Sequence, residues 1–213
     1  MQELENERRE YRFSKLDETH LAKNPLDQFS NWMKEALDAG IQDPTAMTVS
    51  TVNASGQPAS RIVLLKGFDE TGFRFFTGLD SHKGQDIRAN PRVALHFPWL
   101  QMDRQVIVKG IASQLDRALV EQYFARRPRE SQVAARVATQ STTIASRETL
   151  DAAYQQTLRE FEGKDIPAPE NWGGFAVTPD AFEFWQGGEH RLHDRFVYER
   201  DSRDGWKISR LAP

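Results

Sequence analysis

Hydrophobic positions change from a helical spacing to an extended spacing early in the chain. Between Pro25 and Gly40, apolar residues such as Phe29, Trp32 and Met33 recur at helical spacing, which predicts an amphipathic helix ending at Gly40. From residue 46 onward, short apolar and β-branched runs are separated by Gly, Asn and Asp, which is typical of strands joined by turns. Strands are expected at residues 47–52, 60–67, 73–77, 92–97 and 105–115.

The rest of the chain combines predicted helices with closing strands. Asp116 is a suitable N-cap for a helix through Arg127, and Pro128 discourages its continuation. Further helices are expected at residues 82–90, 129–138 and 147–162. Closing strands are expected at residues 175–177, 181–186, 191–200 and 206–211, after a linker around Pro167 and Pro169. Many short strands with inserted helices predict a β-dominated α+β fold, a β-barrel with peripheral helices.

Length and composition narrow the class of protein. The polar residues 1–23 are expected to form a mobile N-terminal segment, and residues 24–213 a single domain. A net charge of −3 disfavours a general nucleic-acid binder. The chain has no cysteine, which excludes disulfides and thiolate metal sites. The charged N-terminus and the lack of a long apolar run predict a cytoplasmic protein that does not enter a membrane.

The densest polar chemistry lies between Glu183 and Arg195. Gly187 and Gly188 predict a turn between two strands. In an extended segment after this turn, Arg191, His193 and Arg195 would share one face and would repel one another without an anionic or π-rich ligand. The alternative interpretation is a solvated face on an edge strand.

Cations also flank apolar or helical segments elsewhere. Arg61 and Lys66 lie at the two ends of an apolar run, which fits either two phosphate-facing cations or a buried strand with solvated ends. His82 and Lys83 follow Ser81 at a predicted helix start, which fits an anion site or ordinary capping. Tyr123 and Arg127 are four residues apart and are expected to share a helix face.

Other kinds of site have less support. The five histidines, His20, His82, His96, His190 and His193, show no paired metal-ligand spacing. The nucleophile-elbow, P-loop and dinucleotide-binding motifs are absent. The basic run from Arg126 to Arg129 lacks the wider basic surface of a nucleic-acid site.

The segment Phe184-Trp-Gln-Gly-Gly-Glu-His-Arg-Leu-His-Asp-Arg195 resembles the C-terminal signature of the pyridoxine/pyridoxamine 5′-phosphate oxidase family. Further matches to the family pattern run in order along the chain, from Arg8-Arg-Glu-Tyr11 and Arg61-Ile-Val-Leu-Leu-Lys66 to Arg127-Pro-Arg129 and Arg210-Leu-Ala-Pro213. The resemblance therefore covers essentially the whole chain.

This resemblance implies an FMN-binding split β-barrel that forms a homodimer with FMN at the subunit interface. It implies oxidation of pyridoxamine 5′-phosphate and pyridoxine 5′-phosphate to pyridoxal 5′-phosphate. Hydride would pass from the substrate C4′ to flavin N5, and O2 would reoxidise the flavin and give H2O2. Family members usually have arginine where this chain has His82, so a phosphate contact of His82 is the weakest of the implied contacts.

The resemblance also implies individual roles. FMN contacts are expected for Arg61, Ile62, Val63, Leu64, Leu65, Lys66, Phe76, Thr77, His82, Lys83, Gln105, Gln140, Ser141, Trp185 and Arg195. Substrate contacts are expected for Arg8, Arg9, Glu10, Tyr11, Lys66, Tyr123, Arg127, Ser131, Arg191, Leu192 and His193. Arg191 and His193 are the expected catalytic pair over the substrate ring, and the segment from Arg8 to Tyr11 is expected to fold over it.

Two rival functions differ in the residues that they require. A split-barrel flavoprotein with another substrate would share the FMN positions, but it would not need Tyr123, Arg127, Ser131, Arg191 and His193 together. A carrier of pyridoxal 5′-phosphate without turnover would need the phosphate contacts and no flavin contacts.

Overall fold

The computed structural model describes residues 9–11, 14–201 and 205–213 of the chain. The expected substrate residue Arg8 lies outside these described residues, as does much of the expected mobile segment at residues 1–23. The mobility of that segment therefore stays a prediction.

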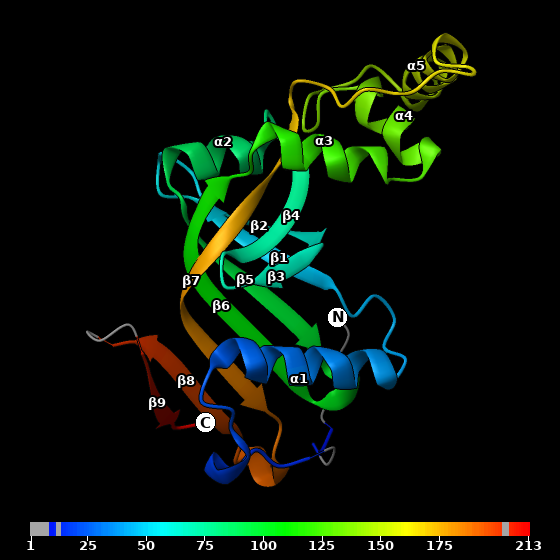
Figure 1. Cartoon of the computed structure of the whole chain (residues 1–213). Helices are drawn as coiled ribbons and strands as arrows, with labels where there is room; N and C mark the ends of the chain where they lie inside the picture. The colour runs from blue at the N-terminus through cyan, green and yellow to red at the C-terminus, as the bar shows by residue number, and fades with distance from the viewer. Residues whose placement is uncertain (1–8, 12–13, 202–204) are drawn as a thin grey trace, which may run out of the picture. The chain divides into compact units, whose positions relative to one another are not determined.

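Strands dominate the described part of the chain (Figure 1), where they form a nine-stranded sheet. Hydrogen bonding follows the order β2-β1-β5-β6-β7-β4-β3, with β8 paired to β7 and β9 paired to β8. The strands are β1 Ala46–Val52, β2 Pro58–Leu64, β3 Gly67–Asp69, β4 Gly72–Gly78, β5 Arg92–Trp99, β6 Arg104–Gln114, β7 Trp172–Gln186, β8 Asp194–Arg200 and β9 Trp206–Leu211.

Five α-helices accompany the sheet within the described residues. They are α1 Pro25–Asp38, α2 His82–Ala89, α3 Arg117–Ala125, α4 Arg129–Val137 and α5 Arg147–Glu160. Short 3₁₀ turns lie at Glu18–His20, Leu100–Met102 and Glu189–Arg191. This strand-dominated arrangement confirms the predicted β-dominated α+β class.

The chain divides into two compact units that are each discontinuous in sequence. The first unit comprises residues 1–49, 94–110 and 179–213, and the second comprises residues 50–93 and 111–178. Strands β1, β5, β6 and β7 contribute residues to both units. The expectation of a single domain over residues 24–213 stays a prediction.

Aromatic packing builds the core of the first unit. Helix α1 begins after Asn24, whose side chain accepts a hydrogen bond from the Leu26 amide at 2.9 Å. Its buried face brings the Trp32 ring edge-on to Phe184, with centroids 5.3 Å apart. Phe184 in turn contacts the Tyr198 ring at 5.4 Å. The helical spacing of apolar residues thus correctly predicted both the helix and its buried face.

The core of the second unit lies between β4, β7 and the helices α3 and α4. Val120 and Phe124 of α3 are buried against Val133 of α4 and Trp172 of β7. Arg117 ties α3 to the segment before β7, because its Nη1 donates to the Pro169 carbonyl at 2.9 Å. This packing fixes one wall of the pocket described below.

The segment before β8 corrects the predicted strand at residues 191–200. Strand β8 begins only at Asp194, and the preceding residues form a 3₁₀ turn in which Arg191 has φ of 65°. The turn is held by the Leu192 amide, which donates to the Glu189 carbonyl at 3.0 Å. Arg191 and His193 therefore do not alternate along one strand, and the prediction that Arg191, His193 and Arg195 share a strand face was wrong.

Strand β7 also differs from the sequence prediction, because it is one strand where two were expected. Its residues 172–177 pair with β4 and its residues 181–186 pair with β8. Pro179 lies between the two paired parts, and the fixed φ of proline is compatible with this extended backbone. Smaller corrections concern β2, which ends at Leu64, and α3, which ends at Ala125 before the Arg127-Pro128 pair.

Candidate active site

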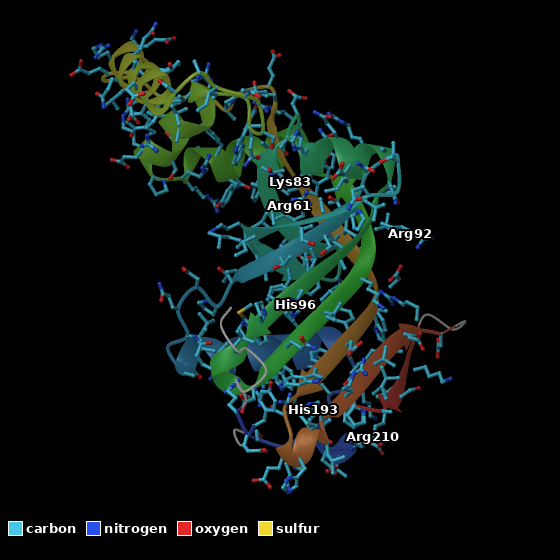
Figure 2. The ribbon with its side chains drawn as sticks, turned by 180° about the vertical axis from the view of Figure 1, so that it is seen from behind. Arg61, Lys83, Arg92, His96, His193 and Arg210 are labelled. Carbon is cyan, nitrogen blue, oxygen red and sulfur yellow. The ribbon has the colours of Figure 1, made fainter. Side chains whose placement is uncertain are left out.

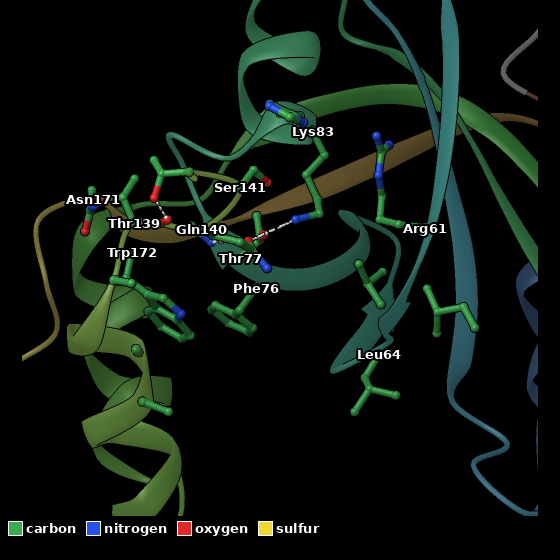
Figure 3. A pocket seen from close by; sticks show the side chains of 18 of the residues that line it. Arg61, Leu64, Phe76, Thr77, Lys83, Thr139, Gln140, Ser141, Asn171 and Trp172 are labelled. Atoms are coloured by element: carbon green, nitrogen blue, oxygen red, sulfur yellow. Dashed lines mark hydrogen bonds between the residues drawn. The ribbon is translucent and has the colours of Figure 1, made fainter. Parts of the chain in front are cut away.

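A cavity of about 840 Å³ lies in the second unit. This volume is in the range that holds drug-sized ligands and cofactors. Thirteen of the expected site residues line it, namely Arg61, Ile62, Val63, Leu64, Lys66, Phe76, Thr77, His82, Lys83, Tyr123, Arg127, Gln140 and Ser141. The fold thus brings together residues from β2, β4, α2, α3 and the loop after α4 (Figure 3).

Lys83 is a buried cation at the first turn of α2, with 6% of its surface exposed. Its Nζ donates to Thr77 Oγ1 at 2.8 Å and to Gln140 Oε1 at 3.0 Å. Burial, with a further contribution from Arg61, lowers the pKa of Lys83 to about 8. An anion bound here would offset both the burial of the ammonium group and its repulsion by Arg61, because it would give the ammonium group a partner of opposite charge.

Arg61 lies near Lys83 (Figure 2), and both residues line the cavity. Its Nη1 donates to Thr51 Oγ1 at 2.7 Å and to the Ala59 carbonyl at 3.1 Å. Two cations, the Thr77 hydroxyl and the start of a helix form a set of donors suited to a phosphate group.

Aromatic rings form another wall of the cavity. The Phe76 ring stacks on Tyr123, with centroids 3.9 Å apart and planes 10° apart, and lies 5.5 Å from the ring of Trp172. The guanidinium of Arg127 lies over Trp172 at 4.7 Å. Parallel rings with an adjacent cation suit a flat, negatively charged ligand.

Arg127 is the second cationic feature of this cavity. It lies just beyond α3, where its amide donates to the Phe124 carbonyl at 3.1 Å. Its Nη1 atom is buried and has no hydrogen-bond partner among the described residues. Burial lowers the pKa of Arg127 and raises that of neighbouring Tyr123. A buried guanidinium nitrogen without an acceptor fits an anionic ligand group.

Two residues expected at this site are not among those that line the cavity. Leu65 is buried with 5% of its surface exposed, and Ser131 lies in the first turn of α4. Lys66 does line the cavity, although it follows β2 rather than ending it.

The cavity also has lining residues that the sequence did not single out for a site. They are Gly78, Ala134, Ala135, Ala138, Thr139, Thr142, Ile144, Leu150, Asn171 and Trp172. Ala134 and Ala135 lie on α4 and Ala138 directly follows it, and their small side chains leave room beside the helix. Trp172 begins a Trp-Gly-Gly run that also matches the family pattern, whereas no local pattern indicated Asn171.

A second cluster of expected site residues lies in the first unit. The Tyr11 ring is edge-on to Trp185 at 5.6 Å and to His193 at 5.3 Å, and the rings of Trp185 and His193 are 4.7 Å apart. The guanidinium of Arg191 lies 5.9 Å from the centroid of the Tyr11 ring. Despite the wrong strand assignment, the fold thus gathers the expected catalytic pair with Tyr11 and Trp185.

His193 has a defined tautomer in this cluster. The Gly188 amide donates to its Nδ1 at 3.1 Å, so a neutral ring carries its proton on Nε2. Burial, followed by the charges of Arg191 and Arg195, lowers the pKa of His193. The imidazole is therefore neutral at neutral pH and presents an N–H donor.

Residues Arg9 to Tyr11 contact the rest of the first unit through an ion pair, a hydrogen bond and ring packing. Arg9 Nη2 lies 2.6 Å from Asp103 Oδ1, and the His190 amide donates to Glu10 Oε2 at 3.4 Å. Tyr11 packs so closely on Gly187 that a Cβ at that glycine would lie 2.8 Å from the Tyr11 ring. The glycine thus makes room for the segment.

Two expected flavin contacts have partners within the first unit. Arg195 donates through Nη2 to Glu183 Oε1 at 2.8 Å and through Nη1 to the Ala212 carbonyl at 2.8 Å. Gln105 Oε1 lies 3.1 Å from His96 Nε2. Leu192, which was expected to contact the substrate, is 70% exposed.

Two other kinds of site are absent from the described residues. Within residues 9–11, 14–201 and 205–213, no group of three or more His, Asp or Glu side chains could hold a metal ion. No helix in the same described ranges has the length and apolar character needed to span a membrane.

The fold defines a strand-dominated protein of the split-barrel class, and its cavity is lined by cations and aromatic rings. Among solved structures, PhzG from Burkholderia lata, in complex with tetrahydrophenazine-1-carboxylic acid, is similar at a TM-score of 0.87 and 26% identity, over 92% of this chain and 95% of that one. A pyridoxamine 5′-phosphate oxidase-related, FMN binding protein from Nostoc punctiforme has a TM-score of 0.72 at 14% identity, over 91% of this chain and 100% of that one, and shows the fold alone.

Sequence comparisons agree with this class. A family model described as pyridoxamine 5′-phosphate oxidase matches residues 33–159, and one described as pyridoxine 5′-phosphate oxidase C-terminal dimerisation region matches residues 172–213. Proteins named pyridoxine/pyridoxamine 5′-phosphate oxidase from Idiomarina loihiensis and Vibrio cholerae are 50% and 48% identical, each over 99% of this chain and 100% of the relative. The chain belongs to the pyridoxamine 5′-phosphate oxidase family.

Proposed function

We propose that this chain is an FMN-dependent oxidase that converts pyridoxamine 5′-phosphate and pyridoxine 5′-phosphate to pyridoxal 5′-phosphate. The observation that carries the proposal is one cavity with two cationic features, Lys83 with Arg61 and the buried Arg127, beside stacked aromatic rings. A phosphorylated cofactor and a phosphorylated substrate each need such a feature.

The first cationic feature fits the phosphate of FMN. Lys83 and Arg61 offer charge, and Thr77 offers a hydroxyl, at a pocket wall where an anion would offset the charge repulsion. Ile62, Val63 and Leu64 continue along β2 from Arg61 as a surface for the flavin ring. FMN, when bound, supplies the two-electron acceptor that the protein side chains lack, and O2 then takes those electrons to give H2O2.

The second cationic feature fits the 5′-phosphate of the substrate. Arg127 has a buried N–H group without an acceptor among the described residues, and Tyr123 offers a hydroxyl beside it. Lys66 lines the same cavity. Ser131 is not among the lining residues. A contact between Ser131 and the substrate would require α4 to move toward the cavity or the substrate to extend beyond it.

We assign the substrate ring to the second cluster from the chemistry of its residues alone. His193 would donate a hydrogen bond from its Nε2–H group to the ring. Arg191 would pair with a negatively charged substituent of the ring. Tyr11 and the residues before it would exclude water above the ring. Trp185, Arg195 and Gln105 would complete the flavin contacts.

Assembly belongs to the same proposal. The C-terminal family model is described as a dimerisation region, which supports a homodimer. We place FMN at the interface between the two copies, and we expect a cytoplasmic enzyme whose residues 24–213 act as one domain.

Product analysis tests this proposal directly. The purified full-length chain, supplied with FMN and pyridoxine 5′-phosphate in air, should form pyridoxal 5′-phosphate and H2O2 in equal amounts. A carrier would bind pyridoxal 5′-phosphate without forming either product. A flavoprotein with another substrate would show a flavin spectrum and no turnover of pyridoxine 5′-phosphate, and either of these outcomes would contradict the proposal.

A further inference from the structure

A short hydrogen-bonded chain of side chains lies behind Arg61 in the second unit. Arg61 Nη1 donates to Thr51 Oγ1 at 2.7 Å, and Thr51 Oγ1 donates to Asp86 Oδ2 at 2.6 Å. Thr51 lies on β1 and has no exposed surface, and the Asp86 side chain on α2 is 12% exposed. Three separate elements, β2, β1 and α2, therefore meet at the Thr51 hydroxyl.

The chemistry of the three side chains fixes which of them donates each hydrogen bond. A guanidinium can only donate hydrogen bonds, and an ionised carboxylate can only accept them. The single hydroxyl proton of Thr51 must therefore point to Asp86, which leaves the lone pairs of Oγ1 for Arg61. Asp86 Oδ2 also lies 3.8 Å from Arg61 Nη2, so the carboxylate and the guanidinium form an ion pair beside the hydroxyl that both of them contact.

We propose that Thr51 and Asp86 are positioning residues that hold the Arg61 guanidinium at the pocket wall, ready for the phosphate of FMN. This inference rests on the proposed function. Asp86 offsets part of the positive charge that Arg61 and Lys83 bring together, so both cations can stay at the wall before an anion binds. The Thr51 hydroxyl bonds to both groups, so it fixes the position of the guanidinium relative to Asp86.

Substitutions at Thr51 distinguish positioning of Arg61 by the hydroxyl from packing of the Thr51 side chain. Thr51→Val removes the hydroxyl with little change in shape and favours the strand, whereas Thr51→Ser keeps the hydroxyl. FMN affinity of the apoprotein is measured by quenching of flavin fluorescence. Thr51→Val should weaken FMN about tenfold, because a charge-assisted contact is loosened. Thr51→Ser should bind FMN like the unchanged protein.

Two further measurements distinguish positioning from a structural effect. Riboflavin carries the same ring without the phosphate, so Thr51→Val should leave its affinity unchanged. In an Arg61→Ala background, Thr51→Val should cause no additional loss of FMN affinity. Equal weakening of FMN and riboflavin, or the same tenfold loss with and without Arg61, would overturn the inference.

FMN binding by the unchanged protein distinguishes a failure of this inference from a failure of the proposed function. If the unchanged protein does not bind FMN, the proposed function fails. If it binds FMN and Thr51→Val binds equally well, only the positioning role of Thr51 and Asp86 is lost.

Discussion

At the scale of a single residue, we predict that Lys83 makes FMN binding dependent on pH. Its pKa of about 8 lies below the ordinary lysine value because the group is buried and lies near Arg61. A bound phosphate favours the ammonium form, so the pKa must be higher in the complex. Below pH 8 the free protein already carries the proton. Above pH 8 binding must take up a proton, so affinity falls as pH rises.

The expected result is a loss of FMN affinity of up to about tenfold per pH unit above pH 8, until the pKa of the complex is reached. Titrations of flavin fluorescence from about pH 7 to 10 measure it, a range in which the FMN phosphate itself stays a dianion. Lys83→Arg is the matched control, because arginine keeps its charge throughout. Parallel curves for the two proteins would remove Lys83 from the phosphate site.

Arg127 should control the affinity for substrate rather than for FMN. Loss of a charge-assisted contact with a phosphate costs about 1.5–3 kcal/mol, or roughly ten- to a hundred-fold in affinity. Arg127→Ala should therefore raise the KM for pyridoxine 5′-phosphate by that factor, while the Kd for FMN stays close to its original value. Steady-state kinetics at saturating FMN measure the effect, and an unchanged KM would show that Arg127 does not hold the substrate.

Arg191 and His193 should affect turnover rather than folding. Both are near Tyr11, and neither is part of the buried aromatic core. Alanine at either position should lower kcat while most FMN stays bound. His193→Ala also removes the acceptor of the Gly188 amide, so a small loss of stability of about 1 kcal/mol is expected. A variant that loses FMN and melts far below the unchanged protein, yet keeps its turnover per flavin, would contradict the catalytic assignment.

Helices and strands with a regular pattern could be predicted from the sequence, and those governed by local backbone geometry could not. Helix α1 shows a clear helical spacing of apolar residues, and an asparagine and a glycine mark its two ends. The turn before β8 depends on positive φ at His190 and Arg191, a conformation that non-glycine residues rarely adopt. Because the residue types there also suit a strand, the alternation of Arg191, His193 and Arg195 was misleading.

The hairpin of β3 and β4 carries an ion pair between Asp69 and Arg74 whose contribution to stability depends on pH. Asp69 accepts hydrogen bonds from Thr71 and Arg74, and these contacts lower its pKa to about 2. Since the folded-state pKa is depressed, the stabilisation is present above about pH 4, the unfolded value, and is lost as pH falls through 2.

Asp69→Asn tests this hairpin contact. The Asp69 side chain is 47% exposed, so solvent screening limits the effect to about 0.5–1 kcal/mol at pH 7. Thermal unfolding should show a lower Tm for the variant at pH 7 and a difference that shrinks as pH falls from about 4 to 2. Equal Tm values at pH 7 would mean that the contact does not stabilise the fold.

The molecule as a whole combines residues that sequence reasoning could identify with supporting residues that it could not. Arg61, Lys83 and Arg127 could be named because their motifs resemble those of a known family, and the fold places all three around one cavity. Thr51 and Asp86 show nothing distinctive in sequence, since their importance arises only where β1, β2 and α2 meet. Supporting contacts of this kind depend on three-dimensional packing rather than on local pattern.

The central claim is that the chain holds FMN and passes electrons to it from a B6 5′-phosphate. Anaerobic addition of pyridoxamine 5′-phosphate to the FMN-loaded protein tests it most directly, with flavin absorbance as the readout. The account predicts that the absorbance bleaches after mixing and returns when air is admitted, with pyridoxal 5′-phosphate as the product. Flavin absorbance that stays unchanged in the presence of bound pyridoxamine 5′-phosphate would contradict it.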